Sequence, residues 1–379
     1  MKNLKPQPLF YLFALITVFT FSVFAQNPTP TPPAVENDDE PIKVSSRLVV
    51  VPVSVTDASG QPVLGLTVKD FFVAEENRPQ TIEKVSDADK VPLEIAILFD
   101  VSSSTGPMFQ FQQETAATFL QDVMRPEDRA TIFTIGAKPV LIQARETSEK
   151  SAVSIKSIQP TKEVQFTAFY DSVRVAADYL DKTAPSGTRK VIVVISDGED
   201  TNSEGIKKAL DEGYRKLGKK IDTIDRKALY ELTVTNRNAA SLREQNRVLK
   251  SLQNADTVFY SINPGGGSLQ LNKMAMFGQS NLEKFAVQTG GTAFLPKFQP
   301  IGLKDNLQNS SNIRKNQETL TTIFRQLANE LRAQYLVQYY SEADFAVNRY
   351  VNLKVGLNNP QNYKVRAREG YFVKGSNSN

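Results

Sequence analysis

The stretch Ile95-Ala96-Ile97-Leu98-Phe99-Asp100-Val101-Ser102-Ser103-Ser104 decides the predicted fold. A continuous apolar run predicts a strand that is buried on both faces, as in a parallel sheet. Alternate residues of an extended chain point the same way, so Asp100, Ser102 and Ser104 would project one carboxylate and two hydroxyls together. Oxygen ligands of this kind favour a hard divalent cation, Mg²⁺ above all.

Two further segments supply matching oxygens. Asp197 follows the apolar run 190–195 just as Asp100 follows its own strand, and Thr167 precedes an amphipathic helix predicted over 168–180. Ligands of open α/β sheets bind at the carboxyl ends of the strands. The predicted metal ligands are therefore Asp100, Ser102, Ser104, Thr167 and Asp197. The alternative is that the two serines cap the next helix and Asp100 accepts backbone amides.

The middle of the chain, from about 91 to 334, alternates predicted strands and helices. Strands are expected at 93–99, 130–135, 140–143, 190–195, 257–262 and 292–295, and helices at 109–124, 168–180, 281–288 and 320–331. This order predicts an α/β fold with a doubly wound, mostly parallel sheet.

Both ends of the chain carry short predicted strands. They begin at residue 47 and recur at 70–76, 80–86, 335–340, 349–355, 363–368 and 371–373. Neither end is large enough to bury a core alone, so we expect one small antiparallel β-sandwich with the α/β domain inserted in it. The predicted domains are 45–90 with 335–375 for the sandwich, and 91–334 for the α/β domain, which contains a charged helical insert at about 204–235.

The N-terminus has the pattern of an export signal. Lys2 and Lys5 precede an apolar run over 9–24, and Val23-Phe24-Ala25 places small residues before the expected cleavage point. We expect a signal peptide over 1–25 and a Pro-rich acidic linker over 26–44. The protein would then be secreted, periplasmic or on the cell surface, with no membrane span left. An uncleaved anchor is the alternative, but the apolar run is short for a span.

Composition excludes several kinds of catalytic site. The chain has no Cys and no His, which removes thiolate nucleophiles, disulfides and Ser-His or Cys-His pairs. The formal net charge of +4 demands no nucleic acid partner. We therefore expect a protein that is not an enzyme and does not bind nucleic acid.

The five predicted ligands resemble the metal-ion-dependent adhesion site (MIDAS) of von Willebrand factor type A (VWFA) domains. Asp100, Ser102 and Ser104 fill the D-x-S-x-S pattern, Thr167 the threonine position, and Asp197 the final aspartate in its S-D-G context. The segments 167–171, 196–200, 289–294 and 366–371 are similar to secreted bacterial VWFA-related proteins. The resemblance covers roughly residues 47–373.

The resemblance implies how such a site works. Ser102 and Ser104 would bind Mg²⁺ directly, with Mn²⁺ or Ca²⁺ as alternatives, while Asp100 and Asp197 often act through water. Thr167 would change between direct and water-mediated contact. The implied function is an exported cell-adhesion module that docks a protein or matrix ligand through an acidic residue of that partner. Two alternatives stay open: an envelope scaffold or assembly protein whose cation is mainly structural, and a metal-assisted hydrolase.

The segment from Asp200 to Gln253 is about thirty residues longer than the family's minimal domain needs. It carries many basic residues, namely Lys207, Lys208, Arg215, Lys216, Lys219 and Lys220. Because it leaves the strand that ends at Asp197, it should begin near the metal site. It is either a specificity insert that meets acidic partners or a solvated helical excursion. Glu199 and Asp200 are likewise either extra acidic ligands or solvated loop acids that begin a helix.

Overall fold

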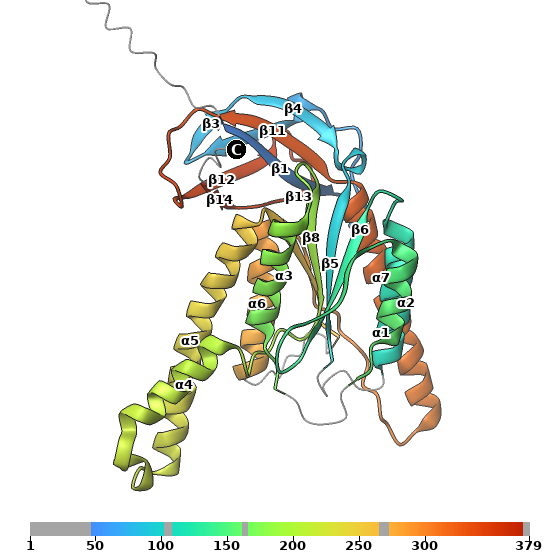
Figure 1. Cartoon of the computed structure of the whole chain (residues 1–379). Helices are drawn as coiled ribbons and strands as arrows, with labels where there is room; N and C mark the ends of the chain where they lie inside the picture. The colour runs from blue at the N-terminus through green and yellow to red at the C-terminus, as the bar shows by residue number, and fades with distance from the viewer. Residues whose placement is uncertain (1–46, 102–107, 161–165, 265–272, 374–379) are drawn as a thin grey trace, which may run out of the picture. The chain divides into compact units, whose positions relative to one another are not determined.

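A central sheet of six strands, in the order β10-β9-β8-β5-β6-β7, organises the computed structural model (Figure 1). The model describes residues 47–101, 108–160, 166–264 and 273–373. The strands are β5 (Leu93–Asp100), β6 (Arg129–Ile135), β7 (Val140–Glu146), β8 (Arg189–Ile195), β9 (Thr257–Ile262) and β10 (Ala293–Phe294). β5 pairs in parallel with both β6 and β8, whereas β7 runs antiparallel to β6. The predicted mostly parallel sheet is confirmed.

Helices cover both faces of this sheet. They are α1 (Phe109–Val123), α2 (Ser148–Ser157), α3 (Phe169–Thr183), α4 (Glu204–Leu217), α5 (Arg226–Asn254), α6 (Lys273–Thr289) and α7 (Asn306–Arg332). Ile95 and Ile97 of β5 belong to a core with α1 and α7, and Ala96 and Leu98 belong to a core with α3 and α6. Each face of β5 is therefore buried, which explains why its sequence is apolar without alternation.

The two chain ends together form a β-sandwich. One sheet has the order β13-β1-β11-β4 and the other β14-β12-β2-β3. Their bounds are β1 (Arg47–Thr56), β2 (Phe71–Glu75), β3 (Arg78–Gln80), β4 (Ile82–Asp87), β11 (Tyr335–Ser341), β12 (Tyr350–Leu357), β13 (Lys364–Ala367) and β14 (Gly370–Phe372). β1 lies between two C-terminal strands, and its alternate valines, Val49, Val51 and Val53, enter the sandwich core. The fold class predicted from the sequence, a sheet inserted in a sandwich, is confirmed.

The sandwich contacts the end of the central sheet where the parallel strands begin. Arg368 forms an ion pair with Asp256, directly before β9, and donates a hydrogen bond of 2.9 Å to the carbonyl of Val50. Gln253, near the end of α5, donates from Nε2 to the Tyr350 hydroxyl of β12 at 3.4 Å. These contacts leave the carboxyl ends of the parallel strands away from the sandwich.

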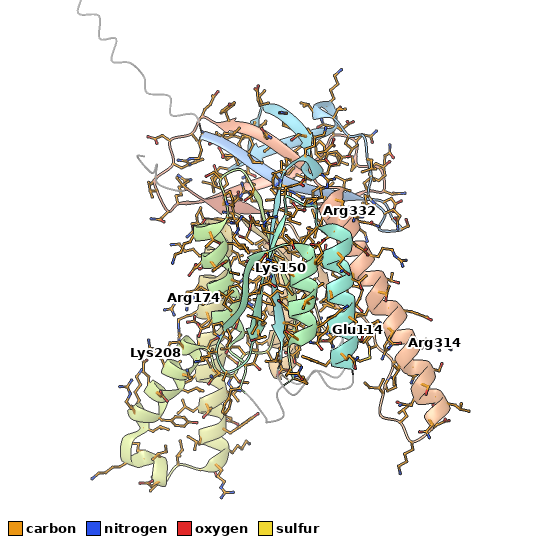
Figure 2. The ribbon with its side chains drawn as sticks, turned by 45° about the vertical axis from the view of Figure 1, so that its right-hand side comes forward. Glu114, Lys150, Arg174, Lys208, Arg314 and Arg332 are labelled. Carbon is orange, nitrogen blue, oxygen red and sulfur yellow. The ribbon has the colours of Figure 1, made fainter. Side chains whose placement is uncertain are left out.

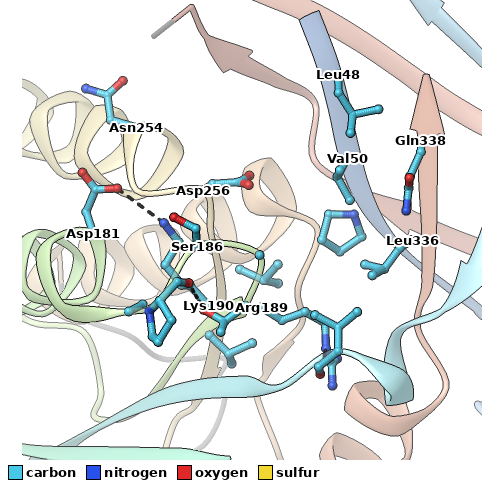
Figure 3. A pocket seen from close by; sticks show the side chains of 18 of the residues that line it. Leu48, Val50, Asp181, Ser186, Arg189, Lys190, Asn254, Asp256, Leu336 and Gln338 are labelled. Atoms are coloured by element: carbon cyan, nitrogen blue, oxygen red, sulfur yellow. Dashed lines mark hydrogen bonds and ion pairs between the residues drawn. The ribbon is translucent and has the colours of Figure 1, made fainter. Parts of the chain in front are cut away.

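A cleft of about 900 Å³ lies along this seam (Figure 3). Leu48, Val50 and Leu336 line it from the sandwich, while the ion pair of Asp181 with Lys190, at 3.4 Å, lines it from the α/β side. This cleft is thus distant from the strand ends that carry the predicted metal ligands.

Several helices differ from their predicted lengths. The helix expected at 320–331 begins at Asn306, because Asp305 caps it by accepting hydrogen bonds from the backbone of Leu307 and Gln308. The helix expected at 281–288 begins at Lys273, and α2 was not predicted at all. The insert expected at 204–235 is a helical hairpin whose second helix reaches Asn254.

The predicted signal peptide and linker, 1–25 and 26–44, lie outside the described residues. Within the described ranges, no helix is both long enough and apolar enough to cross a membrane. The domain boundaries near residues 90 and 334 stay a prediction.

Candidate metal centre

Three of the five predicted ligands, Asp100, Thr167 and Asp197, are described by the structure. Ser102 and Ser104 lie outside the described residues. The three described side chains belong to segments that meet at the carboxyl edge of β5, β6 and β8, hereafter the metal edge.

Asp100 is the last residue of β5 and is only 1% exposed. The parallel register pairs Phe99 with Ile195, so Asp100 comes next to Ser196 at the end of β8. The Ser196 hydroxyl donates a hydrogen bond of 2.6 Å to Oδ2 of Asp100. A hydrogen bond to a charged acceptor offsets part of the cost of burying this carboxylate and fixes its orientation.

Thr167 is held between the loops that follow β6 and β8. Its backbone N–H donates to Oγ1 of Thr201 at 2.8 Å, and its carbonyl accepts from the N–H groups of Thr201 and Asn202. The next residue, Ala168, donates its N–H to the carbonyl of Gly136 at 2.7 Å. These bonds keep Thr167, which is 8% exposed, beside the strand that ends in Asp100.

Asp197 lies in a tight turn directly after β8. Its Oδ1 accepts the N–H of Glu199 at 3.0 Å, and Gly198 has a φ of +78°. A Cβ on Gly198 would overlap the carbonyl oxygen of Gly278 and lie 2.8 Å from Cγ of Leu282. Only glycine fits a turn that combines positive φ with such close contact to helix α6.

A buried polar network supports this turn from behind. Asn281 of α6, 1% exposed, donates from Nδ2 to the carbonyl of Gly198 at 2.9 Å. Its Oδ1 accepts from the Tyr170 hydroxyl at 3.1 Å and from Gln245 Nε2 at 3.0 Å. Asn281 was not predicted from the sequence, because one asparagine in a helix has no local pattern that points to a distant loop.

Asp200 has a structural role at the starts of two helices, only one of which was expected from the sequence. Its two oxygens accept hydrogen bonds from the backbone N–H groups of Tyr170, Asn202 and Ser203 and from the Ser203 hydroxyl. It therefore ties the start of α3 to the start of α4. The expected solvation is wrong for Asp200, which is 7% exposed, but its expected place at the start of a helix agrees with its bonds to Ser203 before α4. Burial raises its pKa to about 6.

Negative charge gathers at the metal edge. Burial raises the pKa of the Glu199 carboxyl, and the nearby carboxylates of Asp197 and then Asp100 raise it further. In the described ranges, no group of three or more acidic side chains could hold a metal ion by itself. A cation here would need hydroxyl oxygens besides the carboxylates. The donor set of Asp100, Thr167 and Asp197, all oxygen, fits a hard cation such as Mg²⁺.

A family model for the von Willebrand factor type A domain matches residues 95–199. The match begins within β5 and includes Asp100, Thr167 and Asp197. A search of curated proteins finds no match to this chain.

Several solved structures are similar to this chain. Proximal thread matrix protein 1 from the mussel byssus, with a zinc-occupied MIDAS motif, is 12% identical with a TM-score of 0.40. That alignment covers 68% of this chain, which spans half the length of the mussel chain. An aerotolerance-related membrane protein from Bacteroides fragilis is 14% identical, with a TM-score of 0.32 and 62% and 98% of the two chains covered. The PilB minor pilin from Streptococcus sanguinis is 13% identical, with a TM-score of 0.41 and 64% and 62% covered.

Proposed function

We propose that this chain, whose residues 95–199 match the von Willebrand factor type A domain, is an exported, non-enzymatic binding module. It docks a protein or matrix ligand through a divalent cation at the metal edge, and the partner supplies an acidic side chain. The proposed ligands are Asp100, Ser102, Ser104, Thr167 and Asp197, and the proposed cation is Mg²⁺.

One observation carries the proposal. Asp100, Thr167 and Asp197 come from three segments that are far apart in the sequence, yet the Ser196–Asp100 and Thr167–Thr201 hydrogen bonds join these segments at one sheet edge. The side chains offer only oxygen, which suits Mg²⁺ and excludes the nitrogen and sulfur ligand sets of zinc or copper sites.

The chain's own residues have distinct tasks in this proposal. Ser196 orients the buried Asp100 carboxylate, and the Gly198 turn, supported by Asn281, holds Asp197 after the strand. Thr167 offers a neutral oxygen, so the protein contributes two negative charges to the centre. A bound divalent cation would supply an electrophilic coordination position that a partner carboxylate can fill.

The absence of His and Cys from the whole sequence supports a binding role rather than catalysis. Without them, the chain lacks the side chain that most often acts as a general base near neutral pH and the most reactive nucleophile. The rival proposal is an envelope scaffold in which the cation stabilises the fold but touches no partner.

The first experiment measures whether the predicted residues hold Mg²⁺. We expect MgCl₂ to raise the Tm of the wild-type protein. At a hundredfold excess over Kd, binding adds about 2.7 kcal/mol to the free energy of unfolding. The double variant Asp100→Ala/Asp197→Ala should lose this shift. Asp211→Ala/Asp344→Ala, which removes two exposed acids away from the metal edge, should keep it. An equal shift in both double variants would refute the proposed ligand set.

The second experiment separates docking from scaffolding. Immobilised wild-type protein and the Asp100→Ala/Asp197→Ala variant are exposed to surface proteins in Mg²⁺ and in EDTA. The docking proposal expects capture only by the wild type in Mg²⁺. Capture that survives both EDTA and the double substitution would favour the scaffold.

A further inference from the structure

The helical hairpin of α4 and α5 extends well beyond the body of the domain. Every buried residue of α5 lies at or after Ala240, so its first fourteen residues, 226–239, contain none. At 1.5 Å per residue, this part without buried residues is about 21 Å long. In α4, only Ile206 is buried. Contacts with the domain therefore anchor the hairpin at one end alone.

The hairpin extends past the metal edge. α5 ends at Asn254 and leads into the start of β9 at Thr257, so it runs antiparallel to the parallel strands and begins beyond their carboxyl ends (Figure 1). The base of the hairpin is tied to the same edge. Ser203, which precedes α4, bonds to Asp200, and Asp200 in turn accepts the N–H of Tyr170, three residues after Thr167.

The two helices of the hairpin pack closely. A Cβ on Gly205 would overlap the Glu244 carboxylate, and a Cβ on Gly213 would overlap the Asn236 side chain. At the far end, Asp225 caps α5 by accepting the N–H groups of Lys227 and Ala228 at 2.9 and 3.2 Å. The hairpin therefore presents its far end in a defined position.

Positive charge is concentrated at that far end, residues 215–227, hereafter the hairpin tip. It holds six basic side chains against Asp222 and Asp225, namely Arg215, Lys216, Lys219, Lys220, Arg226 and Lys227. This excess of four positive charges equals the formal net charge of the entire chain. All six are exposed, and within the described ranges none forms an ion pair.

Further basic side chains lie between the tip and the domain, where Lys208 pairs with Glu204 at 3.2 Å and Arg247 pairs with Glu244. A groove of about 610 Å³ between α4 and α5 is lined by Lys208, Lys216, Arg243 and Arg247, together with Glu212 and Glu244 (Figure 2 labels Lys208 on α4). Exposed aromatic and aliphatic side chains accompany the charges, with Tyr214 40%, Ile221 38% and Tyr230 69% exposed. Arginine and tyrosine are enriched in protein–protein interfaces.

We propose that the hairpin tip is a second docking surface for the partner bound at the metal edge, and that this partner is a protein with an extended acidic surface. The inference rests on the proposed function, because the cation takes one partner carboxylate while the tip attracts further acidic side chains. Exposed charges of opposite sign mainly accelerate encounter and select the partner. A nucleic acid fits less well, since its continuous phosphates would face the carboxylates of Asp100, Asp197 and Glu199.

The test measures binding of a fluorescent ten-residue oligoglutamate peptide to the full mature chain. We expect Lys216→Glu/Lys219→Glu/Lys220→Glu to weaken binding at least tenfold at low salt, with the difference shrinking at high salt. The matched control is Lys84→Glu/Lys354→Glu/Lys364→Glu, which changes net charge equally through exposed lysines of the sandwich. It should stay within about twofold of wild type, since distant exposed charges are screened. Circular dichroism and Tm verify that both triple variants are folded.

The same binding experiment, repeated with and without Mg²⁺, also distinguishes this inference from the proposed function. In EDTA, the wild type should retain a weaker, salt-sensitive affinity that the tip variant loses. Equal effects of the two triple variants would overturn the inference even if binding still depends on Mg²⁺ and on Asp100. If peptide binding depends on the hairpin tip but not on Mg²⁺, the docking role of the tip is supported and the cation proposal is overturned. Tighter, tip-dependent binding of a ten-nucleotide single-stranded DNA than of the peptide would overturn the partner class.

Discussion

At the scale of single residues, the metal edge depends on side chains that offer oxygen and on neighbours that fix them. The alternating pattern after β5 and the aspartate after β8 were sufficient to predict Asp100 and Asp197 as candidates. The hydroxyl of Ser196 and the amide of Asn281 were not predicted, although each makes a direct hydrogen bond to this edge. Their partners lie 96 and 83 residues away in the sequence, so no local pattern marks them.

Ser196→Ala tests the orientation of Asp100. Loss of the 2.6 Å hydrogen bond leaves a buried carboxylate less constrained, so we expect Mg²⁺ affinity to fall about tenfold or more, as for other partners of metal ligands. Isothermal titration calorimetry measures the change. Ser157→Ala, at an exposed serine of α2, is the control and should bind Mg²⁺ like wild type. Unchanged affinity in Ser196→Ala would show that Asp100 needs no such support.

Gly198→Ala tests the turn that carries Asp197, and Gly187→Ala provides a matched control. Both glycines have similar positive φ, +78° and +80°, but a Cβ on Gly187 has no atom within 4 Å. Gly187→Ala should therefore cost only about 1–2 kcal/mol for backbone strain. Gly198→Ala should cost about 1–3 kcal/mol more, because of its overlap with Gly278 and Leu282. Urea denaturation measures both, and equal losses would contradict the close contact with α6.

At the scale of elements, capping and packing set where helices begin and how they join. The sequence predicted the strand–helix order, but it placed the start of α7 fourteen residues too late and missed α2. The exposed first part of α7 is polar, so its hydrophobic spacing is weak, and the Asp305 cap is the signal that determines its start. Asp200 is the corresponding device at the metal edge, since it serves α3 and α4 together.

Asp200→Asn tests this double cap. The amide nitrogen cannot accept hydrogen bonds, so we expect a loss of about 1–3 kcal/mol in the free energy of unfolding. Burial raises the pKa of Asp200 to about 6 from an ordinary value of 3.8. Between these values the folded state binds more protons than the unfolded state, so wild-type stability gains as pH falls. The difference in unfolding free energy between wild type and variant should therefore increase from pH 7 to pH 4.5.

Urea denaturation of both proteins across this pH range measures the difference in unfolding free energy. The pH dependence contributed by other acidic groups is the same in both proteins and cancels in this difference. Asp211→Asn, at an exposed position of α4, is the control and should follow the wild type at every pH. A difference in unfolding free energy between wild type and Asp200→Asn that does not change with pH would contradict the raised pKa of Asp200.

At the scale of the whole molecule, the sandwich closes the chain on itself. β1 pairs with β11 and β13, so an N-terminal strand lies between two C-terminal strands in one sheet. Inside it, the buried Glu75 of β2 accepts hydrogen bonds from Tyr339 at 2.9 Å, Tyr371 at 2.6 Å and Ser341 at 2.8 Å. Neither terminal segment could satisfy these groups alone. The sandwich therefore depends on both chain ends, and Arg368 connects it to the central sheet.

Arg368→Ala tests the connection between the sandwich and the α/β part. Arg368 pairs with Asp256, bonds to the carbonyl of Val50 and stacks 5.4 Å from the Tyr371 ring centroid, and its side chain is 11% exposed. We expect a loss of about 2–3 kcal/mol in unfolding free energy. The control is Arg349→Ala, an exposed arginine 4.7 Å from the Phe345 ring centroid within the sandwich, which should cost about 1 kcal/mol or less. Equal losses in the two variants would mean that the contacts of Arg368 between the sandwich and the α/β part add no stability beyond that of an exposed arginine.

Local sequence patterns were sufficient to predict the mostly parallel sheet, the two-ended sandwich and the oxygen-bearing residues after β5 and β8. These features follow from periodicity, strand order and the rule that ligands gather at carboxyl ends, all of which act over short stretches of chain. The folded structure was needed to find that Asn281 supports the Gly198 turn, that Asp200 caps two helices, and that the basic tip lies beyond the metal edge. Each of these features depends on a contact between distant segments or on the direction of a packed helix. Local sequence patterns indicate neither such contacts nor helix directions.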